Sequence, residues 1–208
     1  GSSMWGGIAP QDVVKALGDM KSAKTLNVYI NSPGGDVFDG VAIYNLLKRF
    51  DGPINVFVDG LAASIASVIA MAGTTIATAH NATWMVHDPW GFGVGSASEL
   101  RALADTLDTI RGSLVDTYAK RTGQTTDKIS QWMSDETWMD ASTAQSNGFT
   151  DTIIDDTKVA NEVAFPLLDK YGKTPPAMRA RANASDVKLA TMESRVFRNV
   201  RRTSLANR

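Results

Sequence analysis

Ser64 is the residue of this chain whose type and surroundings best suit nucleophilic chemistry. It follows an apolar stretch over residues 54–58 and the small-residue run Gly60-Leu61-Ala62-Ala63, and it begins a run of small and aliphatic residues that ends at Gly73. This order predicts a strand, a tight turn and a buried helix. A serine in the first helical turn lies among backbone N–H groups without intrahelical partners, where an oxyanion is stabilised. A capping role for Ser64 explains the pattern equally well.

A serine nucleophile also needs a base, a group that orients the base, and N–H donors that face the oxyanion. The chain has two histidines, and one of them, His87, ends a predicted strand over residues 83–87 that could lie beside the Ser64 turn. The Gly34-Gly35 pair offers flexible backbone N–H groups, and Asp135-Glu136 offers carboxylates. These residue types favour serine-dependent acyl transfer, although a lone histidine is more often structural than catalytic.

The elements that must position these residues alternate between helices and strands, which is typical of α/β architecture. Glycine, proline and asparagine separate stretches with helical spacing from short β-rich runs. The predicted helices cover about residues 10–22, 38–49, 125–133 and 141–147, with a long one from Ser96 or Ser98 to Arg121, and the predicted strands cover residues 26–30, 54–58, 75–79, 83–87 and 149–154. The long helix has an apolar stripe that could pack on its own body or on a partner subunit.

Composition removes several classes of function. The chain has no cysteine, which excludes disulfides, thiolate catalysis and cysteine-ligated zinc. With two histidines, a histidine-rich metal site is not expected, and we predict neither a metal nor a cofactor. Residues 60–79 carry no charge, but Ala, Ser, Thr and Gly dominate them and Gly73 interrupts them, so we predict a buried helix and no membrane span.

Charge divides the chain into an acidic body and a basic tail. The net charge is −1, but residues 173–208 hold nine Lys or Arg against two acidic residues, a net +7 that leaves −8 for residues 1–172. We predict an expression scar at residues 1–3 and one domain over residues 4–157. The tail over residues 158–208 is expected to hold a linker and either a basic amphipathic helix or a solvated end.

Four motifs resemble, in their order and close to their spacing, the proteolytic subunit of the Clp protease, ClpP, over roughly residues 8–154. They are Asn31-Ser32-Pro33-Gly34-Gly35, Gly60-Leu61-Ala62-Ala63-Ser64, Met85-Val86-His87-Asp88-Pro89, and Glu136-Thr137-Trp138-Met139 with Ala144 and Gly148. The amino-acid sequences of residues 60–73 and 135–144 are most similar to those of the ClpP-like head maturation (prohead) proteases of tailed phages and prophages.

The resemblance implies a ClpP/crotonase-like α/β fold of stacked β-β-α units with a long protruding handle helix, which in ClpP joins two heptameric rings. It implies a serine endopeptidase with Ser64 as nucleophile and His87 as base. The oxyanion donors would be the backbone N–H of Gly35 or Gly34 and that of Ile65. The segment that binds an extended substrate, as an added strand, corresponds to residues Trp90, Gly91, Phe92, Gly93 and Val94.

Two departures from the family pattern affect this expectation. The strand and axial loops that precede the first helix in ClpP are reduced here to Met4-Trp5-Gly6-Gly7-Ile8, which puts docking to an unfoldase ATPase in doubt. Where the family has aspartate as the third catalytic residue, the spacing from His87 places Glu136, with Asp135 as the runner-up. If residues 134–137 are extended, the two carboxylates point to opposite faces and only one can meet His87.

The leading hypothesis is a ring-like, homo-oligomeric serine endopeptidase that cuts capsid or scaffold proteins during phage head maturation, in the host cytoplasm or within the prohead. The alternatives are a cellular ClpP-like peptidase that works with an unfoldase, a crotonase-fold acyl-CoA enzyme, and a non-catalytic scaffold on the same fold. A Ser-Lys peptidase would have to use Lys120. We expect no membrane partner, and nucleic acid only through the basic tail. Deletion after Thr157 is expected to leave peptide hydrolysis intact.

Overall fold

The structure is a computed structural model that describes residues 8–20, 22–154 and 171–176. The amphipathic helix predicted in the basic tail lies outside the described residues. Within the described ranges, no helix combines the length and the apolar character that crossing a bilayer requires.

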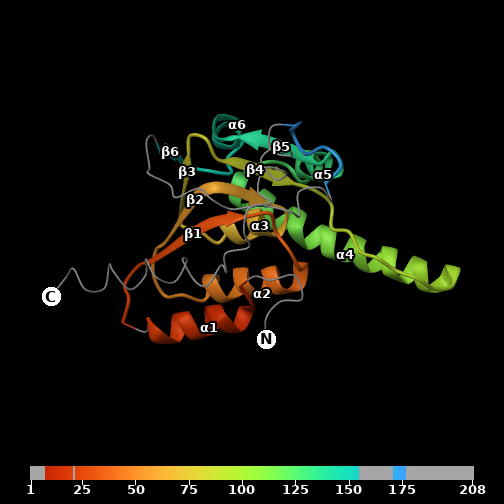
Figure 1. The fold of residues 1–208 in the computed structure, drawn as a ribbon, viewed down its shortest axis with the longest axis horizontal. Helices are drawn as coiled ribbons and strands as arrows, with labels where there is room; N and C mark the ends of the chain where they lie inside the picture. The colour runs from red at the N-terminus through yellow and green to blue at the C-terminus, as the bar shows by residue number, and fades with distance from the viewer. Residues whose placement is uncertain (1–7, 21, 155–170, 177–208) are drawn as a thin grey trace, which may run out of the picture.

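Helices and strands are interspersed along the described chain, as the sequence predicted, although one strand, Thr137–Asp140, was not predicted (Figure 1). The helices are α1 (Pro10–Asp19), α2 (Val37–Lys48), α3 (Ile65–Ala70), α4 (Ala97–Thr122), α5 (Thr126–Ser134) and α6 (Ala141–Ser146). The strands are β1 (Leu26–Ser32), β2 (Ile54–Ala63), β3 (Thr75–Ala79), β4 (Thr83–Val86), β5 (Thr137–Asp140) and β6 (Thr152–Ile154). Figure 1 shows α1 and α2 below β1 and β2, with β5 and α6 at the opposite end of the body.

Strand β2 organises the sheet, because its two halves pair with different neighbours. Its first half pairs in parallel with β1 and with β3. Its second half pairs in parallel with β4, where Ala63 lies opposite Met85. Strand β6 adds in parallel beside β3, and β5 adds antiparallel beside β4. The expectation that β2 ends at Val58 in a tight turn is wrong, because pairing with β4 continues the strand to Ala63.

Two other strand boundaries differ from the prediction. Strand β1 runs on to Ser32, which pairs with Ala62 across an irregularity in the ladder. Strand β6 begins at Thr152 rather than at Phe149. Phe149 is fully buried, and the hydroxyl of Thr150 donates a hydrogen bond to the Ile76 carbonyl at 2.9 Å, so this stretch is held by core packing before the strand begins.

The main core holds the sheet and the base of α4 together. Trp84 of β4 is fully buried, and its indole N–H donates a hydrogen bond to the Thr78 hydroxyl at 3.2 Å. The rings of Trp84 and Tyr118 both contact Phe149, with centroids 5.9 and 5.8 Å away. Because burial of one large apolar side chain stabilises a fold by about 1.5–3 kcal/mol, this aromatic cluster fixes α4 against the strand that precedes His87.

Helix α4 leaves the body as a protruding arm (Figure 1). Ser96 and Glu99 form a capping box at its start, and Gly123, with φ 72°, ends it in the left-handed conformation. The buried residues of α4 lie near its C-terminal end, whereas Leu100 is 44% exposed. The predicted apolar stripe therefore covers the body at one end of the helix and is partly exposed at the other.

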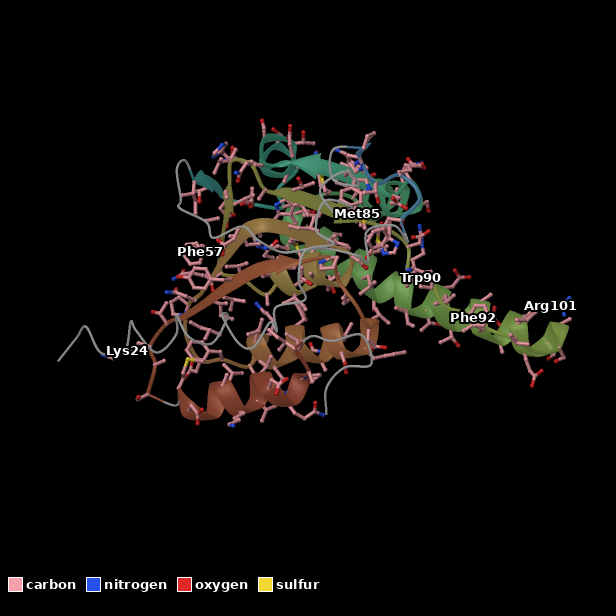
Figure 2. The ribbon with its side chains drawn as sticks, viewed as in Figure 1. Lys24, Phe57, Met85, Trp90, Phe92 and Arg101 are labelled. Carbon is pink, nitrogen blue, oxygen red and sulfur yellow. The ribbon has the colours of Figure 1, made fainter. Side chains whose placement is uncertain are left out.

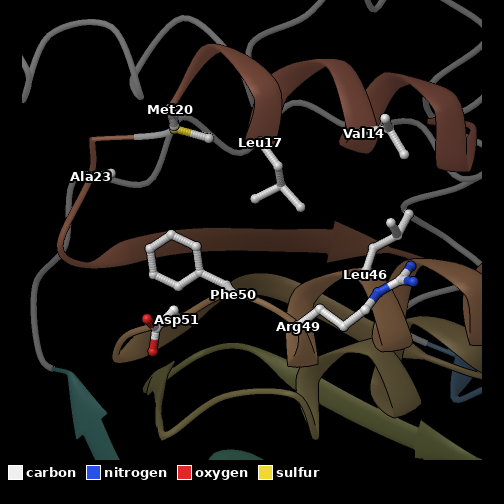
Figure 3. A pocket seen from close by; sticks show the side chains of 8 residues that line it. All are labelled: Val14, Leu17, Met20, Ala23, Leu46, Arg49, Phe50 and Asp51. Carbon is white, nitrogen blue, oxygen red and sulfur yellow. The ribbon is translucent and has the colours of Figure 1, made fainter.

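A hollow of about 390 Å³ lies between α1 and the end of α2 (Figure 3). Leu17, Met20, Leu46 and Phe50 are among the side chains that line it. None of its lining residues belongs to the candidate active site. Across the described ranges, no group of three or more His, Asp or Glu side chains is arranged to hold a metal ion.

Candidate active site

The side chains of Ser64 and His87 lie together. Oγ of Ser64 and Nε2 of His87 are 2.8 Å apart, which is hydrogen-bond distance and is the geometry that a serine nucleophile with a histidine base would need. The register of β2 and β4 accounts for this proximity, because Ala63 lies opposite Met85, Ser64 follows Ala63 directly, and His87 follows Met85 by two residues. The backbone N–H of Ser64 also donates to the Met85 carbonyl at 2.9 Å.

The backbone of Ser64 has an unusual conformation, with φ 56° and ψ −133°. A positive φ costs a non-glycine residue on the order of 1–3 kcal/mol and persists only where the surrounding structure fixes it. Here Ser64 stands directly between β2 and α3, so the strand passes into the helix at this single residue. Its side chain makes no cap hydrogen bond to α3, so the capping explanation is wrong. The hydroxyl faces His87 instead.

The glycine turn lies against Ser64. Gly34 has φ 91°, and a Cβ at this position would come within 2.7 Å of the Ser64 Cβ and 3.2 Å of the Ile65 nitrogen, so only glycine fits. The N–H of Gly34 donates to Ser32 Oγ at 3.2 Å. In the part of the chain that the structure describes, no hydrogen bond from the N–H of Gly35 or Ile65 is found. Gly34 and the Ile65 nitrogen therefore lie close to Ser64, and the oxyanion role of Gly35, Gly34 and Ile65 stays a prediction.

Ser67, one turn along α3, is engaged in the core. It is fully buried, and its hydroxyl donates to the Ser64 carbonyl at 2.6 Å and lies 2.7 Å from the Tyr118 hydroxyl. Burial raises the pKa of Tyr118, so this phenol stays neutral. Ser67 therefore ties the backbone of Ser64 to α4 and is poorly placed to act as a nucleophile.

Asp88 fixes the chain directly after His87. Its carboxylate accepts hydrogen bonds from Arg111 Nε at 2.7 Å and from the Ser134 hydroxyl at 3.0 Å. Its backbone N–H donates to the Met133 carbonyl at 3.0 Å. These contacts join the end of β4 to α4 and α5, and they hold the position from which His87 reaches Ser64.

The two acids predicted to orient His87 lie at the end of α5. Asp135 follows the last residue of α5 in a helical conformation, and its carboxylate accepts a hydrogen bond from Gln131 Nε2 at 2.8 Å. Glu136 is left-handed, with φ 50°, and its N–H still donates to the Met133 carbonyl at 3.2 Å. Because residues 135 and 136 form a turn and not an extended segment, the condition for the two side chains to point to opposite strand faces is not met.

The Glu136 carboxylate bonds to a segment near the C-terminal end of the described chain, the stretch 171–176 beside β5 and α5 in Figure 1. Oε2 accepts the N–H of Gly172 at 2.9 Å, and Oε1 accepts the N–H of Lys173 at 2.6 Å. The indole N–H of Trp138 also donates to Oε1, at 3.2 Å. A role of Glu136 toward His87 stays a prediction.

Tyr171 enters the site with this segment, and the sequence analysis did not identify it. Its side chain is buried in a small apolar cluster with Leu61, Ala63 and Met85. Its ring centroid lies 5.1 Å from that of His87, in an edge-on arrangement. The only signal in the sequence was an aromatic residue followed by glycine in a polar stretch, just before residues that were assigned to a linker.

The hydroxyl of Tyr171 reaches two further parts of the site. It donates a hydrogen bond to the Pro33 carbonyl at 2.6 Å, at the start of the glycine turn. Burial raises the pKa of Tyr171 to about 12, while a hydrogen bond with the Ser64 side chain acts in the opposite direction. The phenol is therefore neutral at physiological pH, and Tyr171 lies beside Ser64, His87 and the glycine turn.

The predicted substrate-binding segment runs out along α4. Trp90, Phe92 and Val94 are 59%, 88% and 89% exposed, respectively. Side chains added at Gly91 and Gly93 would face leucines of α4. Figure 2 shows Trp90 near the base of α4 and Phe92 farther along it. The Trp90 end of the segment is therefore nearer the body, and substrate binding along the segment stays a prediction.

Comparison with known proteins agrees with this architecture. Residues 11–157 match the family model described as Clp protease. The chain is 34% identical over 134 residues to ATP-dependent Clp protease proteolytic subunit 2 of Synechococcus sp. (strain CC9605), which covers 64% of this chain and 68% of that relative. It is 36% identical over 138 residues to the ATP-dependent Clp protease proteolytic subunit of Chlorella vulgaris, over 65% of this chain and 68% of that relative.

A third relative, the ATP-dependent Clp protease proteolytic subunit of Pleurastrum terricola, is 35% identical over 140 residues, which is 66% of this chain and 71% of that relative. The family match includes Ser64, His87 and Glu136 and confirms the predicted fold class. It ends before Tyr171. The segment that contacts the site therefore lies outside the region shared with the family.

Proposed function

This chain belongs to the Clp protease family, which makes it a peptidase, and from this premise we propose that it is a serine endopeptidase acting through Ser64 and His87. The observation that carries the proposal is the 2.8 Å separation of Ser64 Oγ and His87 Nε2. The positive φ of Ser64 supports it, because strained backbone of this kind is concentrated at functional sites. A crotonase-type acyl-CoA enzyme would typically use carboxylates in place of this pair.

In the proposed reaction, His87 Nε2 accepts the proton of Ser64 as Oγ attacks the carbonyl carbon of the scissile bond. The negative charge that develops on the carbonyl oxygen faces the N–H groups of Gly35 and Ile65. His87 then passes the proton to the leaving amine, and the acyl group remains on Ser64. A water molecule, deprotonated by His87, releases the acyl group through a second oxyanion.

For the residue that orients His87 we propose Glu136, with Asp135 as the runner-up. The Asp135 carboxylate is engaged by Gln131 on α5, which disfavours it. Glutamate is one methylene longer than the aspartate of the family.

For the natural substrate we propose a capsid or scaffold protein that is cut during phage head maturation. The support is the amino-acid sequence of residues 60–73 and 135–144, which resembles that of phage prohead proteases. Co-expression with a candidate phage capsid protein should yield a shortened capsid protein, detected by mass spectrometry, and Ser64→Ala should leave it at full length. An unprocessed capsid protein beside an active peptidase would contradict this assignment.

Work with an unfoldase ATPase is a second candidate, because the three relatives are named ATP-dependent Clp protease proteolytic subunits. Degradation of a folded protein only in the presence of a Clp ATPase and ATP would favour it. Cleavage of the capsid protein without ATP would favour head maturation. For both settings we propose a ring-like homo-oligomer with α4 at a subunit contact.

Reaction with a fluorophosphonate probe tests the proposed chemistry. The probe should label the full chain at Ser64, located by peptide mapping, and Ser64→Ala should abolish the label. His87→Ala should label slowly, because the nucleophile then lacks its base. Labelling at Ser67 would move the nucleophile one helical turn, and a protein that never labels would be a non-catalytic scaffold.

A further inference from the structure

We infer that residues 171–174, here termed the docked segment, are an intramolecular ligand of the active site: Tyr171 fills a side-chain pocket beside Ser64, and the segment competes with the polypeptide substrate. The inference rests on the proposed function, because it names what keeps the proposed peptidase in a closed resting state. It also reverses the expectation that the chain beyond Thr157 does not affect hydrolysis.

The pocket that receives Tyr171 is separate from the main core. Successive side chains of a strand point to opposite faces of the sheet. Ala62 and Trp84 face the main core, whereas the residues beside them in β2 and β4 face Tyr171. The three pocket residues Leu61, Ala63 and Met85 are at most 1% exposed. Tyr171 covers an apolar surface that adjoins Ser64, where a side chain of a bound peptide could otherwise pack.

The polar contacts of Tyr171 go to groups that the proposed reaction needs. Its hydroxyl donates to the Pro33 carbonyl at 2.6 Å, and its oxygen lies near the Ser64 side chain. Its ring lies edge-on to His87. One side chain thus lies against the proposed base and the start of the glycine turn, beside the position that a substrate carbonyl must approach.

The backbone of the docked segment donates hydrogen bonds to the Glu136 carboxylate. The N–H groups of Gly172 and Lys173 donate to its two oxygens at 2.9 and 2.6 Å, and the Lys173 ammonium donates to the Asp135 carbonyl. Hydrogen bonds between backbone N–H groups and a carboxylate are charge-assisted and do not depend on the side chains of the peptide. The carboxylate that we propose to orient His87 is therefore occupied as long as the segment is docked.

The docked segment contacts Ser64 through a side chain rather than through a peptide bond. The Tyr171 carbonyl oxygen accepts a hydrogen bond from the Thr174 hydroxyl at 3.1 Å, which closes a local turn. The group that reaches Ser64 is the phenol, which contains no bond that the enzyme can cut. This arrangement fits a blocking ligand and disfavours a substrate poised for self-cleavage.

Tethering makes such a ligand effective even when its intrinsic affinity is low. Residues 155–170 join the docked segment to β6 in the same chain. A tethered ligand has an effective concentration of about the millimolar range, so a modest affinity keeps the site occupied. The family match ends before the segment, so the blocking ligand is an addition to the shared peptidase body.

Removal of the Tyr171 ring is the first test. In the full chain, Tyr171→Ala should raise the rate of Ser64 labelling by a fluorophosphonate, and kcat/KM for a fluorogenic peptide, by about tenfold, because one aromatic anchor often dominates a docked segment. Tyr171→Phe keeps the ring and removes the hydroxyl, so its rise should be smaller. A fall or no change in Tyr171→Ala would overturn the inference and make the segment a structural support of the site.

A matched pair at Lys173 tests the backbone contacts. Lys173→Ala removes the ammonium and keeps the N–H that Glu136 accepts, whereas Lys173→Pro removes both. The proline variant should label Ser64 faster than the alanine variant. Equal labelling rates in the two variants would count against competition through the Glu136 carboxylate.

Binding in trans separates this inference from the proposed function. A fluorescein-labelled peptide of residues 169–176 should bind the full chain carrying Ser64→Ala and Tyr171→Ala, measured by anisotropy, and the same peptide with alanine for tyrosine should not. Equal binding of both peptides would overturn the inference. Because this assay needs no catalysis, a protein that never reacts with the fluorophosphonate in any variant refutes the proposed function and leaves the binding result to decide the inference.

Discussion

The two halves of the candidate site are built in different ways. Ser64 and His87 are positioned by neighbouring strands, through the register of β2 and β4 and the hydrogen bond from the Ser64 N–H to the Met85 carbonyl. Glu136 is bound by N–H groups of Gly172 and Lys173, from the far end of the described chain. The first half follows from the sheet itself, whereas the second depends on whether the docked segment is in place.

This difference separates the Ser64–His87 pair, which must be rigid, from the hydrogen bonds of Glu136, which can change. A nucleophile and its base keep a productive geometry only when rigid elements carry them. A carboxylate that is bonded to a detachable segment can exchange those bonds for others when the segment leaves. The Ser64–His87 pair can therefore have its productive geometry while the docked segment still blocks the site.

The largest expected effect comes from breaking the first half. Ser64→Ala and His87→Ala should each lower kcat for a peptide by about 10⁴-fold or more, and the double variant should be hardly worse, because the two residues act as a unit. Initial rates with a fluorogenic peptide measure this. His80→Ala is the matched control: the side chain of His80 is exposed, and the activity should stay near wild type. Additive losses in the double variant would contradict a coupled pair.

Glu136→Gln should give the next largest effect, because glutamine cannot stabilise a protonated His87. We expect a loss of turnover approaching about 10⁴-fold if Glu136 is the third catalytic residue, with Asp135→Asn near neutral. The measurement should be made with Tyr171→Ala in both proteins, so that release of the docked segment does not mask the loss.

The opposite result, loss in Asp135→Asn alone, would assign the role to Asp135. Full activity in both variants would mean that Ser64 and His87 work as a dyad. That outcome would sharpen the comparison, because the second half would then serve only to bind peptide backbone, either that of the docked segment or that of a substrate.

The sequence was sufficient to predict the first half because both residues stand at the ends of locally patterned strands. It did not predict the length of β2, because Gly60 and the small residues after it resemble a turn until β4 pairs with them. It did not predict the contacts of Tyr171, because Pro33, which its hydroxyl contacts, is 138 residues away and such a contact leaves no periodic pattern. The left-handed turn at Glu136 was also not predicted, because it depends on where α5 ends.

Charged substitutions on the protruding arm, α4, test whether the Ser64–His87 pair needs a second subunit to keep its geometry. Leu100 is 44% exposed, and Leu103 lies beside it on the apolar stripe of α4. Glutamate at both positions should lower the oligomer mass measured by native mass spectrometry, because the stripe is expected to be a subunit contact. The rate of Ser64 labelling should change by less than about twofold, as is usual for surface substitutions.

Arg101→Glu, an exposed charge change on the same helix, is the control for the arm and should leave the oligomer mass unchanged. An unchanged mass in the leucine variants would contradict the subunit contact. A large loss of Ser64 labelling in the leucine variants would contradict the division of the site. The geometry of Ser64 and His87 would then depend on assembly and not on the sheet of one chain.

The smallest expected effect concerns Asp59, a half-buried carboxyl in the part of β2 that leads to Ser64. Burial raises its pKa from 3.8 to about 6. The stability that this group contributes is fully present below its unfolded pKa and is lost as the pH rises through about 6. Asp59→Asn cannot ionise, so it should raise Tm at pH 8 and have little effect at pH 4. A fully buried carboxyl with this shift would be worth about 3 kcal/mol, and partial exposure reduces the expected gain to about 1 kcal/mol.

Thermal unfolding of Asp59→Asn in the wild-type and Tyr171→Ala backgrounds completes the test. If Asp59 belongs to the first half alone, the gain in Tm at pH 8 should be the same in both backgrounds, because effects at independent sites add. An equal gain at pH 4 and pH 8 would show that ionisation is not its cause. A gain that disappears without the Tyr171 ring would show that the docked segment desolvates Asp59, and the division of the site into an intrinsic half and a segment-dependent half would then fail at β2.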